Sequence, residues 1–234
     1  TGCSAPTPPP RSASGETYCT GSTHPLRPAA SRTAGYSPEG TATHPTNTQR
    51  GTTPAERFVV ITGGPGSGKS TLIDALRDAG HPVVREAGRT IIQHQSTIGG
   101  RALPWLNPDL YAEMILSWEI RSYHQAAREP GVVFFDRGVP DVVGSYLLLG
   151  RPVPGHVMRA AETFRYHQRV LIAPPWPEIY RNDQERRQDH DEAVRTYDAM
   201  VAAYTRLGYE LVSLPRTGVP ARVRFALRHA PGVG

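Results

Sequence analysis

Lysine is almost absent from this chain of 234 residues, in which Lys69 stands against 25 arginines. Cysteine is nearly as scarce, because Cys3 and Cys19 are the only two and both lie near the N-terminus. A core without thiols argues against a disulfide scaffold, a zinc site or a cysteine nucleophile. No apolar run approaches the roughly 18 residues of a membrane span, so we expect a cytoplasmic protein without a membrane partner.

Large aliphatic residues are also nearly missing from residues 1–56, which are rich in Pro, Ser, Thr and Gly. Such a segment cannot bury enough apolar surface to offset the entropy lost on ordering, which predicts a disordered tail. Residues 57–234 are predicted to form one domain. The net charge of +5 permits acidic ligands, but the arginines are scattered along the chain. Nucleic acid is therefore not the expected partner.

Strand and helix patterns alternate through the predicted domain. Short apolar runs predict strands at 58–62, 82–86, 131–136, 169–174 and 209–215. Helical patterns fill the intervals, and the longest begins with Asn107 as its cap and Pro108 in its first turn. On that helix a stripe of Tyr111, Met114, Ile115 and Trp118 is expected to face the core, with a ligand site as the alternative. The alternation predicts a three-layer α/β fold around five parallel strands.

One loop motif is specific. "GGPGSGKS", residues 63–70, follows a buried strand, opens a helix and satisfies G-x-x-x-x-G-K-[ST]. Its glycines let backbone N–H groups surround a polyphosphate, and Lys69 supplies a compact charge where the arginine fork fits poorly. Ser70 is expected to hold Mg²⁺ and Thr71 to meet the α-phosphate. The predicted ATP (or GTP) site therefore comprises Gly63, Gly64, Pro65, Gly66, Ser67, Gly68, Lys69, Ser70 and Thr71.

Candidate catalytic residues stand after two other strands. Asp136 ends the third strand, where a carboxylate can reach the Mg²⁺ held by Ser70 or, alternatively, cap the next helix. Its neighbour Arg137 is a candidate ligand for a phosphate or for the acceptor. Glu86 follows the second strand and is a candidate base for a hydroxyl that attacks the γ-phosphate. The alternative for Glu86 is a surface ion pair with Arg85 or Arg89.

An arginine-rich segment, "YRNDQERRQDHDEA", follows the fourth strand. Arg181 and Arg187 are predicted to bind the nucleotide from a lid, with Arg186 placed to neutralise the transferred phosphoryl group. An ordinary charged helix start, crossed by ion pairs, is the alternative.

The order of five segments along the chain resembles that in bacterial AAA-like predicted ATPases. The segments are "ITGGPGSGKSTL", "REAGR", "FFDRGVPDVVGSYLLLG", "YRNDQERR" and "YTRLGYELVSLP". That group is similar to the nicotinamide riboside kinase domain and, more distantly, to nucleoside and nucleoside monophosphate kinases. Over about residues 57–228 the resemblance implies phosphate binding by 63–71, a nucleotide-site role for Asp136, a base at Glu86 and a lid carrying the three arginines. It also implies strand order 2-3-1-4-5. Since no oligomeric-unfoldase helical domain follows, we expect a compact kinase-like fold.

Three functions are compatible with these features. The leading one is a phosphotransferase that moves the γ-phosphate of ATP to a small, unidentified hydroxyl-bearing acceptor, with Mg²⁺ as cofactor. The others are a regulatory NTPase that signals to a protein partner and a polynucleotide-acting ATPase or kinase. No G-x-S-x-G motif or histidine cluster in the sequence favours a hydrolase.

Overall fold

Five parallel strands form one sheet in the order β2-β3-β1-β4-β5. The structure is a computed structural model, and it describes residues 53–179 and 190–232. The strands are β1 (Phe58–Gly63), β2 (Val83–Val84), β3 (Val133–Asp136), β4 (Arg169–Ala173) and β5 (Glu210–Ser213). The predicted fold and strand order are confirmed. Of the tail predicted over residues 1–56, residues 1–52 lie outside the described residues, as do Cys3 and Cys19, whereas its last residues belong to a short helix, α1 (Pro54–Arg57).

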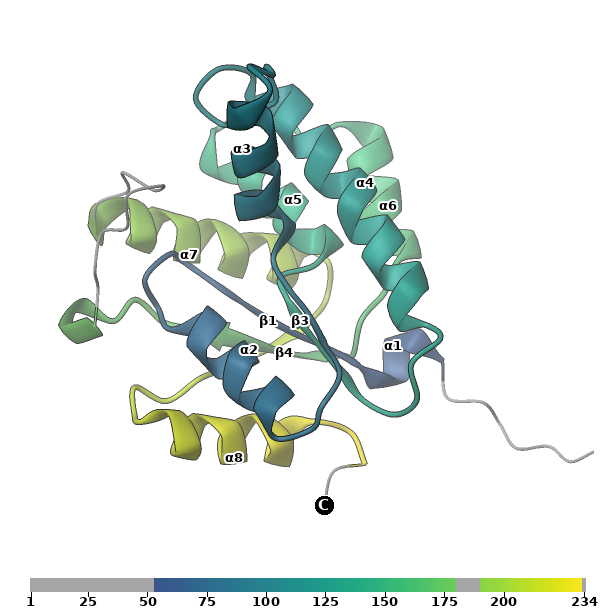
Figure 1. Ribbon diagram of the computed structural model, residues 1–234, viewed down its shortest axis with the longest axis vertical. Helices are drawn as coiled ribbons and strands as arrows, with labels where there is room; N and C mark the ends of the chain where they lie inside the picture. Colours follow the sequence, from purple (N-terminus) through teal and green to yellow (C-terminus); the bar gives the residue numbers. More distant parts are fainter. Residues whose placement is uncertain (1–52, 180–189, 233–234) are drawn as a thin grey trace, which may run out of the picture. The chain divides into compact units, whose positions relative to one another are not determined.

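Helices cover both faces of this sheet (Figure 1). One face packs against α2 (Lys69–Asp78) and α8 (Val219–His229). The other packs against α4 (Pro108–Ala126), α5 (Val139–Leu148), α6 (Gly155–Thr163) and α7 (His190–Arg206). The remaining elements are α1 (Pro54–Arg57), α3 (Ala87–Thr97), which packs against α4, and a 3₁₀ turn at Pro177–Ile179. None of these described helices has the length and apolar content needed to cross a membrane.

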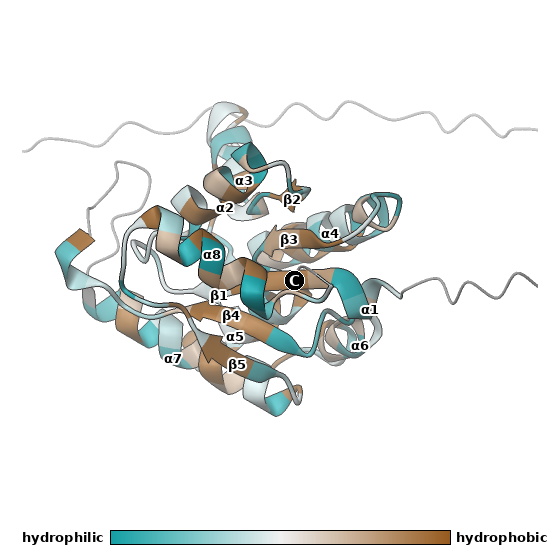
Figure 2. Cartoon of the chain, turned by 90° about the horizontal axis from the view of Figure 1, so that it is seen from below, coloured by the Kyte–Doolittle hydropathy of each residue, from teal (hydrophilic) through white to brown (hydrophobic). Residues whose placement is uncertain are grey.

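The central strand β1 shows why the sheet is buried on both sides. Phe58 and Val60 belong to the core under α4–α7, whereas Val59 and Ile61 belong to the core under α2 and α8. Successive side chains of a strand point to opposite faces, so a continuous apolar run serves both cores. Figure 2 shows the resulting hydrophobic band along the strands, seen from below. The predicted buried strand is therefore confirmed.

Helix α4 corrects one prediction. Asn107 caps it as expected, because its side-chain oxygen accepts a hydrogen bond of 3.1 Å from the Leu110 N–H. The expected core stripe of Tyr111, Met114, Ile115 and Trp118 is, however, only partly buried. The buried stripe lies one position further along, and it consists of Ala112, Leu116, Glu119, Ser122, Tyr123 and Ala126. Two of the displaced residues instead line the cavity described below.

Candidate functional site

The loop between β1 and α2 is shaped by close backbone contacts. Gly64 lies against α7, where an added Cβ would stand 2.3 Å from the Ala193 carbonyl oxygen. Gly68, the N-cap of α2, has a φ of 72°, in the left-handed region that side chains disfavour. The loop therefore needs glycine at both positions. Its backbone opens directly into the N-terminus of α2, where unpaired N–H groups favour anions.

Lys69 lies inside this loop. Its side chain is 6% exposed, and its Nζ donates a hydrogen bond of 2.6 Å to the Gly64 carbonyl oxygen. The Ser67 hydroxyl donates to the same carbonyl at 2.8 Å and lies 3.3 Å from Nζ. The single lysine is thus positioned by the loop that it is predicted to serve.

Arg222 of α8 supports the loop from the other side and was missed by sequence reasoning. Its Nη1 donates to the carbonyl oxygens of Ser67 and Gly68, at 3.1 and 3.2 Å. Its guanidinium carbon also lies 5.6 Å from the centre of the Trp176 ring. Because Arg222 is 154 residues away from Gly68 in the sequence, no local pattern identifies this contact.

Asp136 is brought next to Ser70. It ends β3 beside Ile61 of β1, and its Oδ2 lies 3.5 Å from the Ser70 hydroxyl. Its Oδ1 is buried without a hydrogen-bond partner among the described residues. Burial, followed by the negative charge of Glu86, raises the pKa of Asp136 to about 6. The alternative of a helix cap is wrong, because the N-cap of α5 is Gly138.

Arg137 joins two carboxylates. Its Nε lies 3.2 Å from Glu86 Oε1, and its Nη1 lies 3.0 Å from Asp141 Oδ1. Its backbone has a φ of 75°, the one positive value at a non-glycine position in the described ranges. Glu86 therefore faces inward toward Arg137. The neighbouring Arg85 pairs with Asp74, and the alternative ion pair of Glu86 with Arg89 stays a prediction.

Asp141 accepts four hydrogen bonds within the site. Its Oδ1 accepts from the Thr62 hydroxyl at 2.6 Å and from Arg137. Its Oδ2 accepts from the Gly138 N–H at 3.0 Å and from the Tyr204 hydroxyl at 2.6 Å. These partners come from β1, the β3–α5 turn and α7. Asp141 thereby fixes Arg137 and holds three elements together.

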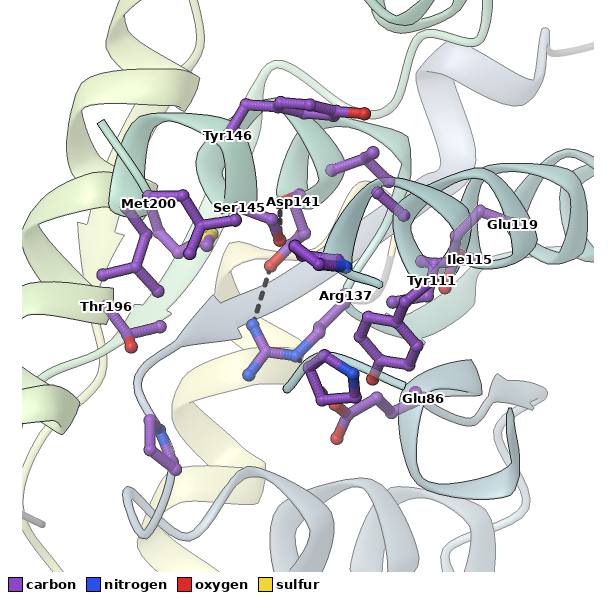
Figure 3. A pocket seen from close by; sticks show the side chains of 18 of the residues that line it. Glu86, Tyr111, Ile115, Glu119, Arg137, Asp141, Ser145, Tyr146, Thr196 and Met200 are labelled. Carbon is purple, nitrogen blue, oxygen red and sulfur yellow. Dashed lines mark hydrogen bonds and ion pairs between the residues drawn. The ribbon is translucent and has the colours of Figure 1, made fainter. Parts of the chain in front are cut away.

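A cavity of about 410 Å³ opens beside the loop at Pro65 (Figure 3). Its walls come from α3, α4, α5, α7 and the segment before α4. Most of its side chains are apolar or aromatic, among them Ile92, Trp105, Tyr111, Ile115, Val142, Tyr146, Leu148 and Met200. Glu86 and Arg137 stand in the same wall.

Glu119 of α4 is the second functional candidate that sequence reasoning missed. It lines the cavity, is 2% exposed, and its Oε2 has no hydrogen-bond partner in the part of the chain that the structure describes. Burial raises its pKa well above the ordinary value, and the nearby charge of Asp141 adds to this. A buried carboxyl with an unsatisfied oxygen is a candidate for ligand contact.

The predicted residues therefore divide into three groups. Lys69, Ser70, Glu86, Asp136 and Arg137 lie around the strand ends at the phosphate loop, next to the cavity. The other loop residues, Gly63 to Gly68 and Thr71, extend from β1 to the first turn of α2. The lid arginines Arg181, Arg186 and Arg187 lie outside the described residues, and their role stays a prediction.

Comparison with known proteins agrees with this geometry. A family model described as an AAA domain matches residues 58–222. No curated protein matches the chain. Among solved structures, the fold is similar to that of a NadR protein in complex with NR, with a TM-score of 0.56 and 16% identity over 77% of this chain. The match covers 53% of the NadR chain, so this chain spans about half of that length.

A deoxyadenosine kinase from M. mycoides has a similar fold, with a TM-score of 0.53 and 13% identity. That match covers 73% of this chain and 97% of the kinase. At these identities the similarity establishes the fold. The predicted resemblance is therefore confirmed for the AAA-type family by the family model and for the fold by these two structures.

Proposed function

Since this chain belongs to the AAA domain family and has the fold of P-loop kinases, we propose that it is an ATP-dependent phosphotransferase. It transfers the γ-phosphate of ATP to the hydroxyl of a small acceptor bound in the cavity. One observation carries this proposal. The cavity is lined by Pro65 of the phosphate loop and by Glu86 and Arg137, and Arg137 directly follows Asp136, whose Oδ2 lies 3.5 Å from the Ser70 hydroxyl.

The phosphate loop supplies the nucleotide end of the reaction. Backbone N–H groups of residues 63–71 and the N-terminus of α2 bind the phosphates, and Lys69 moves its Nζ from the Gly64 carbonyl to the β- and γ-phosphates. The chemistry of Ser70 and Asp136 fits Mg²⁺, because two oxygen ligands lie 3.5 Å apart and Asp136 Oδ1 is buried without another partner. Mg²⁺ supplies charge neutralisation of the phosphates when bound.

The acceptor end uses Glu86. The hydroxyl oxygen attacks the γ-phosphorus, the bond to the β–γ bridging oxygen breaks, and ADP leaves. The hydroxyl proton passes to a Glu86 carboxylate oxygen. Arg137 holds that carboxylate through its Nε, and Asp141 holds Arg137 in turn. In this mechanism catalysis comes mainly from positioning and charge, with no covalent enzyme intermediate.

A Glu86→Gln variant tests this assignment. It should keep ATP affinity, since the loop is untouched, and lose transfer by about 100-fold or more because the base is gone. Transfer is measured by mass spectrometry of products after incubation with Mg-ATP and a panel of nucleosides, sugars and aminoglycosides. A matched control is Glu113→Gln, which removes an exposed carboxylate of α4 paired with His156. Undiminished transfer by Glu86→Gln would rule out Glu86 as the base.

The acceptor panel also tests the phosphotransferase proposal itself. Transfer to a member of the panel supports it. Slow ATP turnover by the wild-type protein with no phosphorylated product would instead favour the regulatory NTPase.

A further inference from the structure

The charged residues of the cavity wall are mostly acidic. Among the described lining residues, four are carboxylic acids, Glu86, Glu119, Asp141 and Glu192, and one is a cation, Arg137. Arg137 already contacts Glu86 and Asp141, at 3.2 and 3.0 Å. The positive charge of Arg137 is therefore neutralised by carboxylates of the protein itself. A phosphate group entering this cavity would meet carboxylates without a further described cation to neutralise it.

Glu119 gives this acidic wall a specific contact point. Its Oε2 is buried, lacks a hydrogen-bond partner among the described residues and belongs to a residue that lines the cavity. Buried polar atoms are normally satisfied, and an exception at a cavity indicates a partner supplied by a ligand. The partner that suits a carboxylate oxygen is an N–H or O–H donor. A cationic donor suits it best, because it favours the charged form that burial opposes.

The rest of the wall defines the body of the ligand. Tyr111 and Ile115 face the cavity from α4, while Tyr146 and Met200 approach it from α5 and α7 (Figure 3). Trp105 stands at the edge and is 65% exposed. Aromatic and aliphatic walls with few polar groups favour a flat or ring-shaped apolar body.

We propose that the phosphate acceptor is itself unphosphorylated, neutral or cationic, and carries a nitrogen donor on a ring-shaped body that Glu119 binds. This inference rests on the proposed function, because it treats the cavity as the acceptor site. It excludes phosphate monoesters as acceptors. It also assigns Glu119 a specificity role distinct from the proton-accepting role of Glu86.

Equilibrium binding tests the inference without requiring transfer. The full chain is saturated with Mg-AMP-PNP and titrated with nucleosides, amino sugars and ring-bearing amino alcohols, each beside its own phosphate ester. Each nitrogen compound is also paired with an analogue that lacks the N–H donor. The proteins compared are wild type, Glu119→Gln and Glu113→Gln. The last removes a carboxylate from the solvent side of the same helix, outside the cavity wall.

We expect at least one unphosphorylated nitrogen compound to bind more tightly than both its ester and its analogue. Glu119→Gln should weaken that binding by about tenfold, because the charge-assisted hydrogen bond is lost, and leave AMP-PNP affinity unchanged. Glu113→Gln should change neither affinity. Preference for the phosphate esters overturns the inference, and so does binding of neither class or equal effects of the two variants. If Glu119→Gln does not fold, the comparison of ligands with the wild-type protein decides alone.

The two proposals fail separately in this design. Transfer to a phosphate ester would leave the phosphotransferase standing and refute the acceptor class. Binding of the unphosphorylated compound without any transfer would support the class of ligand inferred for the cavity and refute the phosphotransferase.

Discussion

Replacing Asp141 by asparagine should destabilise the domain strongly, because no orientation of an amide serves all four donors. The carboxylate accepts from Thr62 and Arg137 on one oxygen and from Gly138 and Tyr204 on the other. If the amide oxygen replaces Oδ1, the amide nitrogen faces the buried Gly138 N–H. If the amide is flipped, its nitrogen faces the Arg137 guanidinium. Either way a buried donor loses its acceptor, and the negative charge opposite Arg137 disappears.

The lost acceptor and the lost charge together determine how far the free energy of unfolding falls. An orphaned buried donor costs about 1–3 kcal/mol, and loss of a charged hydrogen-bond partner costs about 1.5–3 kcal/mol. Since Glu86 still neutralises Arg137, the sum should fall near 3–5 kcal/mol of unfolding free energy. For a domain of this size that lowers Tm by roughly 10 °C.

Urea unfolding followed by circular dichroism measures this change, with Tm from thermal scans as a second reading. The control is Asp78→Asn, which removes a carboxylate whose side chain is 68% exposed and pairs only with Arg77 at the surface. It should alter the unfolding free energy by less than about 1 kcal/mol. A loss below about 1 kcal/mol in Asp141→Asn would refute the conclusion that this carboxylate holds β1, the β3–α5 turn and α7 together.

Three further predictions concern the loop and the cavity. Lys69→Arg should lower ATP affinity by about 10- to 100-fold in a fluorescent-nucleotide titration, because a wide guanidinium replaces a point charge in the loop; unchanged affinity would contradict this. Burial raises the pKa of Glu119 above its ordinary 4.5, so the folded state binds that proton more tightly and wild type loses stability as pH rises above this value. Glu119→Gln removes that loss, and its advantage in urea unfolding should grow from about pH 4.5 to 7; a constant difference would refute the shift. In Gly88→Ala, the new Cβ would stand 2.7 Å from the Tyr111 hydroxyl and displace it, so acceptor binding should fall while ATP affinity persists. In Gly155→Ala the nearest atom is the flexible end of Arg159, so equal losses in both variants would exclude the cavity as the cause.

The parts of the fold that sequence predicts are those set by local periodicity. The continuous apolar run at 58–62 indicated a strand buried on both faces, and both cores do contain its residues. The helix starting at Lys69 carries Leu72, Ile73 and Leu76 at helical spacing, and all three are buried. In β2 the expected strand shortens to Val83–Val84, because only those residues pair with β3.

Helix α4 shows where periodicity fails. It has apolar residues on two adjacent faces, and the larger side chains of Tyr111, Met114, Ile115 and Trp118 made the wrong face look like the core. The truly buried face includes Glu119, a residue type that sequence reasoning assigns to the surface. Its burial follows from the packing of α4 against α3 and α5, which no local pattern encodes.

The Asp141 network is invisible in the sequence for a related reason. Its partners Thr62 and Tyr204 are separated from it by 79 and 63 residues, and only the parallel sheet with α5 packed on α7 brings them together. Asp136 and Arg137, by contrast, could be predicted as site residues because they stand at the end of a strand. Strand ends can be read from a sequence, but contacts made through the core cannot.

Charge separates the two proposed substrates. The phosphate loop offers a helix N-terminus, inward N–H groups and Lys69, whereas the cavity offers carboxylates and one arginine already paired twice. A nucleotide polyphosphate is therefore favoured at one end and repelled from the other, where a neutral or cationic acceptor meets no such penalty. Arg137 lies between the phosphate loop and the cavity, and its two carboxylate partners keep its charge from attracting a second phosphate into the cavity.

If Asp141 and Glu86 were both neutralised, the freed Arg137 should convert the cavity into an anion site, so the double variant Glu86→Gln, Asp141→Asn should gain affinity for phosphate esters. Failure of the folded double variant to gain it would show that pairing of Arg137 is not what excludes them.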